Sequence, residues 1–490
     1  MNARIKAIIS EAWFGCYDNS SGGGSSRASS VHSDSDESSS ADEFWHDLRE
    51  VRRHASPLSS SIRDSIRRIS VSSPRALDDD VKHQQRMLLV LPAFASPATA
   101  AARAEALTRW LAGFDVGWVV GASASLPRRE VARKVREWAQ ALSTMERLFL
   151  LWKPEVAAET SATALGELAA ASAGAMLNLV RAVSALESSP SKLLTALDVY
   201  APVWETYPVL ARLFSWAPSH PVLAAAETAL ADLVDAARRC RRDLGAFIRS
   251  HYPWQMPQGG EVHPCVGFWM GYFRCMLRHR VSLYFVLGGN DDDQRVAEAA
   301  APRREQGAEE GAGLSRLVAE LVSCLEAVLE EKSAALAAPG LRHVFMLNNT
   351  CAVVLHAVGS DLKLFLPPGW VHDHEERMEG YVKGYVAASW APVVSRLADG
   401  GGRRARPSSV IVSGRQNRLN AFRSALESAC SAQRCWKVPN PVLRGVLRKN
   451  VSEKVVPVYR RFLEDHPEVQ VATGLAAEEL EQQLLDLFEG

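Results

Sequence analysis

Apolar residues recur along much of the chain at the spacing of one face of an α-helix. After Pro127 they return in steps of four and three residues until Pro154, and similar runs follow nearer the C-terminus. Such a period places the apolar side chains on one side of an amphipathic helix. The positions concerned are Val131, Val135, Trp138, Leu142, Met145 and Phe149, then Leu314, Leu317, Leu321, Leu325 and Val328, and finally Leu480, Leu484 and Leu487.

Alternation of apolar and polar residues, the signature of a strand, is scarce. Ser408–Ser413 is the one short run that resembles a strand. Prolines, among them Pro202 and Pro208, separate helical stretches of roughly 15 to 35 residues. Gly288–Gly313 and Asp399–Gly414 read as long exposed loops. We therefore predict an all-α fold, in which antiparallel helix pairs stack into an elongated rod.

The N-terminal part differs in composition from the rest. Ser20–Ser40 contains 11 serines in 21 residues, so it cannot bury a core, and we predict a disordered leader. Ser70 follows two arginines in a form that basophilic kinases favour, and Ser73 precedes a proline. Both are candidate phosphorylation sites; the alternative is a polar linker that no kinase modifies. The predicted divisions are 1–85 leader, 86–255 N-terminal bundles, 256–400 middle bundle and 401–490 basic C-terminal module.

Composition narrows the class of protein. The 490 residues carry 56 basic and 56 acidic side chains, which argues against a generally basic nucleic-acid binder. Eight cysteines are too few for a disulfide scaffold, so we expect a reducing cytosol. Charged residues interrupt the first 14 positions, which disfavours a signal sequence. The stretch Met87–Ala102 contains two prolines and is too short to cross a bilayer, so we expect no membrane span.

Signals for catalysis are weak. The sequence has neither a phosphate-binding glycine loop nor a Gly-x-Ser-x-Gly elbow. The cluster His372–Glu376 is rich in potential metal ligands, but its two histidines are two residues apart and point to different helix faces. His263 reads as a helix cap or core residue more readily than as a base. We predict no catalytic residue, no metal and no cofactor.

Charge is strongly polarised near the C-terminus. Arg403–Arg461 contains 14 basic residues against Glu427 and Glu453, a net charge of +12, whereas Phe462–Gly490 has a net charge of −8. A basic module of this kind can dock on an anionic membrane at about 1 kcal/mol per basic residue. The alternatives are solvated helix faces partly paired with the acidic tail, or nucleic acid, which the shortage of stacking aromatics disfavours. The candidate lipid-binding residues are Arg415, Arg418, Arg423, Arg434, Lys437, Arg444, Arg448, Lys449, Lys454, Arg460 and Arg461.

Several short motifs also resemble a known family, the plant branch of the seventy-kilodalton subunit of the exocyst tethering complex. They occur in the family's order and cover about Glu105 to Gly490. The motifs are Ser189–Leu193, Leu197–Tyr200, Gly259–Pro264, Phe345–Asn349, Trp370 with His374, Ser389–Trp390, Asn417–Phe422, Trp436–Pro439, Ser452–Tyr459 and Leu484–Gly490.

The resemblance implies a rod of stacked antiparallel helical bundles and a non-enzymatic role. Family members tether secretory vesicles to the plasma membrane, and their C-terminal domain binds phosphoinositides. It also implies a cytoplasmic protein peripheral to that membrane, with other exocyst subunits and a Rho-type small GTPase as partners. From the residues themselves we expect the motifs to be scaffold: Asn440 caps the helix that Pro441 begins, while Trp436 and Tyr459 pack.

Two departures from the family pattern matter. Family members usually carry a longer N-terminal region with a coiled coil for assembly, whereas here a Ser-rich leader precedes the matching part. The family's lysines after His-Pro-Glu are replaced by Val469–Thr473, so membrane affinity is expected to shift to Arg403–Arg461. The alternative function is therefore a specialised plant interaction platform in defence signalling that does not assemble into the exocyst.

Overall fold

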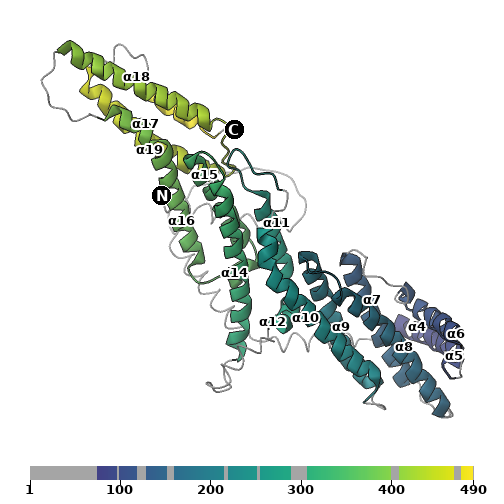
Figure 1. Cartoon of the computed structure of the whole chain (residues 1–490). Coiled ribbons are helices and arrows are strands. Elements are labelled where there is room, and N and C mark those ends of the chain that lie inside the picture. The colour runs from purple at the N-terminus through teal and green to yellow at the C-terminus, as the bar shows by residue number, and fades with distance from the viewer. Residues whose placement is uncertain are drawn as a thin grey trace, which may run out of the picture. The chain divides into compact units, whose positions relative to one another are not determined.

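The regular structure of the computed structural model is helical wherever the chain is described (Figure 1). Within those ranges the chain contains no strand, which confirms the all-α prediction. The predicted rod concerns how the bundles stack, and it stays a prediction. The structure describes residues 74–95, 99–118, 128–151, 159–214, 219–250, 254–287, 306–398, 408–467 and 476–488.

The chain divides into two compact units. The described part of the N-terminal unit lies within Gly23–Asp243 and His279–Gly311, and that of the C-terminal unit lies within Leu244–Arg278 and Ala312–Gly490. Helix α10 (Pro221–Arg249) contributes residues to both units. The candidate phosphorylation sites Ser70 and Ser73 lie outside the described residues.

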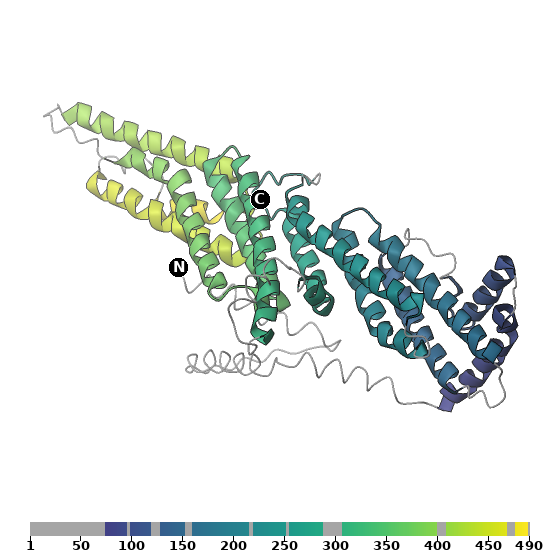
Figure 2. The same cartoon turned by 60° about the horizontal axis from the view of Figure 1, so that its bottom comes forward.

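The N-terminal unit is built from amphipathic helices packed on one another (Figure 2). In α7 the apolar positions Val131, Val135, Trp138, Leu142 and Met145 are buried, as their period predicts. Helix α9 packs against α7, α8 and α12. Besides α10, its helices are α4 (Pro74–Val90), α5 (Pro92–Ala95), α6 (Ala100–Ala112), α7 (Arg128–Leu151), α8 (Glu159–Ser184), α9 (Pro190–Leu213) and α12 (Arg280–Leu287).

The C-terminal unit is centred on the neighbouring helices α15 and α16. The predicted apolar face of α14, from Leu314 to Val328, is buried, and so are Leu480, Leu484 and Leu487 near the C-terminus. The elements are α11 (Pro264–Leu277), α14 (Gln306–Ala334), α15 (Pro339–Val358), η3 (Asp361–Phe365), α16 (Trp370–Ser389), α17 (Ala391–Val394), η4 (Ser395–Leu397), α18 (Ser408–Gln433), α19 (Pro441–Asp465) and α21 (Ala477–Leu485).

The structure corrects three details predicted from the sequence. Ser408–Ser413 is the first part of α18 rather than a strand. The strand preference of its three β-branched residues is weak and depends on context, so they adopt the conformation of the long helix that contains them. Both predicted long loops are shorter, since α14 begins at Gln306 and α18 at Ser408. Pro202 and Pro208 lie inside α9, where the hydroxyl of Thr206 donates to the Pro202 and Val203 carbonyls.

Helix starts follow the local chemistry of the sequence. Asn440 caps α19, and its Oδ1 accepts from the backbone N–H groups of Val442 at 3.0 Å and Leu443 at 3.1 Å. Pro441 then takes the first helical turn, where a missing N–H costs nothing. The predicted cap at Asn440 is confirmed. Ser189 caps α9 in the same manner.

Candidate functional site

Three motifs that are distant in the sequence meet inside the C-terminal unit. Asn348 on α15 donates from Nδ2 to the carbonyl of Gly260 at 2.7 Å and to that of Lys437 at 2.9 Å. The Lys437 N–H in turn donates to the Gly259 carbonyl at 2.8 Å. A single buried amide therefore ties the segment before α11 to the connection between α18 and α19.

The neighbouring Asn349 makes a second set of bonds to the same segment. Its Oδ1 accepts from the His263 N–H at 2.7 Å, and its Nδ2 donates to the carbonyls of Phe345 at 2.7 Å and Glu261 at 3.4 Å. Gly260 needs to be glycine here, because its φ is +80° and an added Cβ would lie 2.9 Å from Leu341. We call Asn348, Asn349 and these backbone partners the buried hub.

A second buried network adjoins the last helices of the chain. The indole of Trp390 donates to the Tyr385 hydroxyl at 2.7 Å, and that hydroxyl donates to Gln433 at 2.6 Å. Trp436 and Phe488 pack against the ring of Tyr385. Tyr459 is also buried and stacks on Phe422. The prediction that Trp436 and Tyr459 are packing residues is confirmed.

The basic residues of α19 fall into two groups, and the outer group is exposed. Lys449 and Arg460 are eleven residues apart, and Lys454 and Arg461 are seven apart, so each pair lies within about 20° around the helix axis. The two pairs flank an exposed arc of the helix. We call Lys449, Lys454, Arg460 and Arg461 the basic surface.

The ion pairs of the basic surface are loose. Lys449 lies 3.3 Å from Glu453, Arg460 lies 3.9 Å from Glu478, and Arg461 lies 3.8 Å from Asp465, all between exposed side chains. Lys454 makes no ion pair with a described residue. Exposed pairs of this kind contribute roughly 0.2 to 1 kcal/mol, so an anionic partner can replace them at little cost.

Other predicted lipid-binding residues are turned toward the chain itself. Arg448 donates from Nε and a terminal nitrogen to the Leu487 carbonyl at 2.8 and 2.6 Å, and Arg444 donates to the Val438 carbonyl at 3.2 Å. Lys437 lies 3.4 Å from Glu261 beside the buried hub. Arg448 therefore joins α19 to the end of the chain, and Arg444 joins α19 to the connection before it. Lys437 is exposed, and its ion pair is as loose as that of Lys449.

The cations of α18 have a mixed environment. Arg418 and Arg423 flank the buried stripe of Leu419, Phe422 and Leu426 and are half-buried themselves. Arg415 is also half-buried, and Arg434 is exposed at the end of α18. These four residues lie on α18 or at its end, outside the basic surface.

The acidic end of the chain lies on α19. Helix α21 packs there through buried Leu480 and Leu484, and its carboxylates stay exposed. Glu478 pairs with Arg460, and Glu481 accepts from the Ser452 hydroxyl at 3.3 Å. The acidic tail therefore pairs with part of the basic module, the alternative that the charge pattern left open.

A family model for the C-terminal region of Exo70, which is a component of the exocyst complex, matches residues 136–486. This chain belongs to the Exo70 family. The matched range contains the buried hub and the basic surface. Since Exo70 proteins are exocyst subunits, the family resemblance drawn from the motifs is confirmed.

Two curated plant relatives agree with this assignment. The chain is 28% identical to exocyst complex component EXO70B2 of Arabidopsis thaliana, over 61% of this chain and 47% of that protein. It is 24% identical to EXO70A1 of the same plant, over 66% of this chain and 51% of that protein. The chain thus spans about half the length of the curated relatives it matches. A solved structure of S. cerevisiae Exo70 is 13% identical, with 99% and 94% coverage and a TM-score of 0.49.

The two histidine sites considered for chemistry have structural partners. His263 caps α11 by accepting from the Cys265 N–H at 3.2 Å, and burial lowers its pKa to about 4. His374 is buried between the Trp370 carbonyl at 2.7 Å and Glu326 at 2.5 Å. Within the described ranges, no group of three potential ligands could hold a metal ion.

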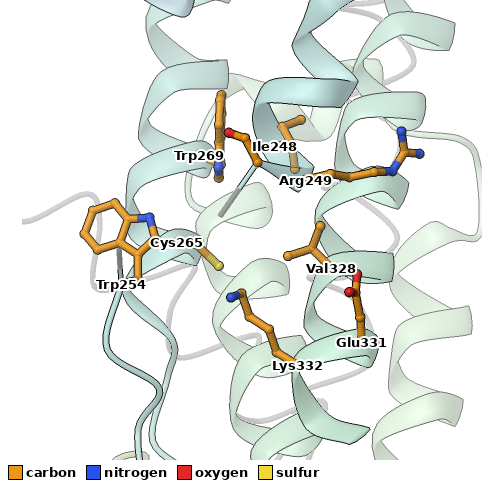
Figure 3. A pocket seen from close by; sticks show the side chains of 9 residues that line it. Ile248, Arg249, Trp254, Cys265, Trp269, Val328, Glu331 and Lys332 are labelled. Atoms are coloured by element: carbon orange, nitrogen blue, oxygen red, sulfur yellow. The ribbon is translucent and has the colours of Figure 1, made fainter. Parts of the chain in front are cut away.

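One small pocket in the C-terminal unit of this Exo70 chain lies between α10, α11 and α14 (Figure 3). Trp254, Trp269 and Cys265 line it together with Arg249, Glu331 and Lys332. Its cavity volume is about 30 Å³, far below the roughly 300 to 1,000 Å³ of ligand-binding pockets. Burial raises the pKa of the Cys265 thiol to about 11, so this sulfur is not a ready nucleophile.

Among the described residues, one helical segment has the length and composition of a membrane span. It is Thr163–Ser184 in α8, where 56% of the most apolar window is buried inside the protein. A core helix of a folded domain passes the same test, and Leu168, Ala173 and Leu177 of this helix are fully buried. Packing inside the N-terminal unit therefore explains the apolar composition of Thr163–Ser184.

The roles of Asn348 and Asn349 could not be assigned from the sequence. Both lie in the mixed stretch Phe345–Cys351, and the neighbouring residues do not show whether an amide at these positions is buried or exposed. The family motif Phe345–Asn349 marked the positions without giving their partners. The signal that could have found them is two consecutive amides in a run whose neighbours all fit a core.

Proposed function

We propose that this Exo70 chain acts as an exocyst-subunit adaptor in exocytosis, tethering secretory vesicles to the plasma membrane. Family membership supports the exocyst role, and the exposed arc of α19 supports a membrane contact. In this proposal the protein is cytoplasmic and peripheral to the plasma membrane. Other exocyst subunits are its partners, and a Rho-type GTPase stays a prediction from the family.

The membrane contact is proposed to use anionic phospholipids, phosphoinositides among them. The observation that carries it is the exposure of Lys449, Lys454, Arg460 and Arg461 on one helix with loose ion pairs. The phosphate groups of phosphoinositide headgroups bring several negative charges together at the membrane surface, so they can replace several of these weak ion pairs at once. Arg415, Arg418, Arg423 and Arg434 lie outside this surface, on α18 or at its end, and would add to the positive potential of the same module.

Vesicle sedimentation tests the membrane half of the proposal. The full chain is mixed with phosphatidylcholine vesicles with or without phosphatidylinositol bisphosphate, at about 50 and 200 mM salt. We expect recovery with the phosphoinositide vesicles at low salt and much less at high salt. Equal recovery with both vesicle types at low salt would remove this half of the proposal.

Affinity purification from plant cells tests the exocyst half. Stoichiometric recovery of other exocyst subunits is the expected result for a tethering role. Their absence, with vesicle binding intact, would instead favour the specialised interaction platform in defence signalling. The two assays are independent, so failure of one half leaves the other measurable.

A further inference from the structure

The N-terminal unit carries an apolar patch on its surface, formed by α9 and α12. Trp204 is 46% exposed and Val281 is 40% exposed, although both are large apolar side chains. The ring of Phe285 joins them, with its centroid 5.1 Å from that of Trp204 and 5.5 Å from that of Tyr200. Pro208, one helical turn after Trp204, is exposed on the same face.

The geometry of this patch is rigid. Helices α9 and α12 are joined by a bond from the buried Ser282 hydroxyl to the Leu197 carbonyl at 3.1 Å. Near the start of the patch, Asp198 accepts from Arg128 at 2.5 Å and lies 3.1 Å from His279. The aromatic rings are therefore held in place before any partner arrives, which lowers the entropy cost of binding.

One charged side chain beside the patch has no ion pair or hydrogen bond with a described residue. This is Glu205, next to Trp204, and partial burial raises the pKa of its carboxyl. The nearby Arg212 is already bound to Glu146. Arg280, at the start of α12 and next to Val281, is exposed and lies about 140° round that helix from Phe285.

We propose that the patch of Trp204, Phe285 and Val281 binds a partner protein segment that presents apolar side chains beside an arginine or lysine. The apolar side chains cover the rings, and the partner's cation lies against Trp204 and Glu205 together. An arginine can stack on an indole and pair with a carboxylate at the same time. Exposed tryptophans at rigid sites are frequent binding hot spots.

A membrane is a poorer occupant of this patch. The carboxylate of Glu205 would face anionic lipid headgroups, and like charges repel. The patch also belongs to a different unit from the basic surface. This proposal therefore stands apart from the proposed membrane contact and can fail or succeed without it.

Two labelled amphipathic peptides test the proposal on the full chain. One carries leucines flanked by arginines, and the other has glutamates in place of the arginines. Fluorescence anisotropy measures the dissociation constant of each for the wild type, Trp204→Ala, Glu205→Lys and the control Leu364→Ala. Leu364 is 57% exposed in the other unit, so Leu364→Ala controls for non-specific binding of the peptides to exposed apolar side chains.

We expect the arginine peptide to bind the wild type, with at least tenfold weaker binding to Trp204→Ala and unchanged binding to Leu364→Ala. Glu205→Lys should weaken the arginine peptide and strengthen the glutamate peptide. No binding, equal binding of both peptides, or insensitivity to Trp204→Ala would overturn the proposal. So would a concentration-dependent dimer that Trp204→Ala dissolves, because the patch would then bind a second copy. Circular dichroism melting confirms that each variant is folded.

Discussion

The buried hub and the basic surface lie in the same unit but follow opposite rules. In the buried hub, Asn348 and Asn349 have fixed partners at hydrogen-bond distance, and replacing either would leave several buried groups unpaired. On the basic surface, Lys449 has one loose ion pair, with Glu453, and Lys454 has none with a described residue. The comparison teaches that the buried residues of the family motifs, such as Asn348 and Asn349, are scaffold, whereas the exposed residues proposed to act, Lys454 of the motif Ser452–Tyr459 among them, are weakly constrained by the fold.

The largest effect is expected from a change in the buried hub. Asn349→Leu removes the acceptor of the His263 N–H and the donor to the Phe345 and Glu261 carbonyls. The His263 N–H and the Glu261 carbonyl lose their partner, while the Phe345 carbonyl keeps its helical bond from the backbone N–H of residue 349. Each buried group left unpaired costs roughly 1 to 3 kcal/mol, so we expect a loss of about 2 to 6 kcal/mol in the free energy of unfolding. Urea denaturation measures it.

Asn417→Leu is the matched control for this change. Asn417 belongs to a family motif as well, but it is exposed on α18. Its replacement should alter stability by less than about 0.5 kcal/mol. If both variants lose the same stability, membership of a family motif rather than burial would determine the cost of a substitution. That result would contradict the contrast between the buried hub and the exposed residues.

The second effect is a pH dependence from His263. Its folded pKa of about 4 lies below the unfolded value of 6.5, because burial disfavours the charged ring. The stability linked to the neutral ring is therefore complete above pH 6.5 and falls as the pH drops toward 4. The loss over this window is at most about 3 kcal/mol.

His263→Asn isolates this contribution, since an asparagine can still cap α11. Unfolding free energies measured between pH 7 and 4 should fall less steeply in this variant than in the wild type. Parallel curves would show that His263 does not titrate as its burial implies. The half-buried His343 and His356 contribute equally to both proteins, because burial lowers the pKa of each in both.

A smaller effect is expected from the carboxylates of α21. Glu478→Gln with Glu481→Gln removes two negative charges beside the basic surface. Binding to phosphoinositide vesicles should become about threefold to tenfold tighter, while stability changes by less than about 1 kcal/mol. Sedimentation at low salt measures the binding.

Glu331→Gln with Glu376→Gln serves as the control, because both carboxylates are exposed in the same unit but lie on α14 and α16. It changes the net charge equally. If this control tightens vesicle binding as much as the α21 variant, net charge rather than the basic surface controls binding.

Helix positions were predictable from the sequence because burial follows a simple period. The apolar residues of α7 and α14 repeat every three or four positions, and Asn440 before Pro441 is a local capping signal. Pro202 and Pro208 were misplaced because tertiary packing keeps α9 helical where local propensity would end it. Ser408–Ser413 was misplaced for a related reason: a short β-branched run does not outweigh a 26-residue helix.

The candidate site was predictable in its charge but not in its geometry. Counting basic residues cannot separate Lys454, which is exposed, from Arg448, which donates to the Leu487 carbonyl. Both lie in the same basic stretch of the sequence. They differ in exposure because Leu487, near the end of the chain, packs beside Arg448. The partners of Asn348 and Asn349 depend on segments about 90 residues away and leave no local signal.

The central claim is that the basic surface binds anionic membranes and contributes little to the fold. The most direct measurement is sedimentation of a variant with Lys449, Lys454, Arg460 and Arg461 all changed to glutamine. Its control carries glutamine at four exposed arginines of the N-terminal unit, Arg109, Arg133, Arg181 and Arg239. We predict at least tenfold weaker binding to phosphoinositide vesicles, an unchanged melting temperature, and wild-type binding by the control. Wild-type binding by the first variant, or equal losses in both, would contradict the account.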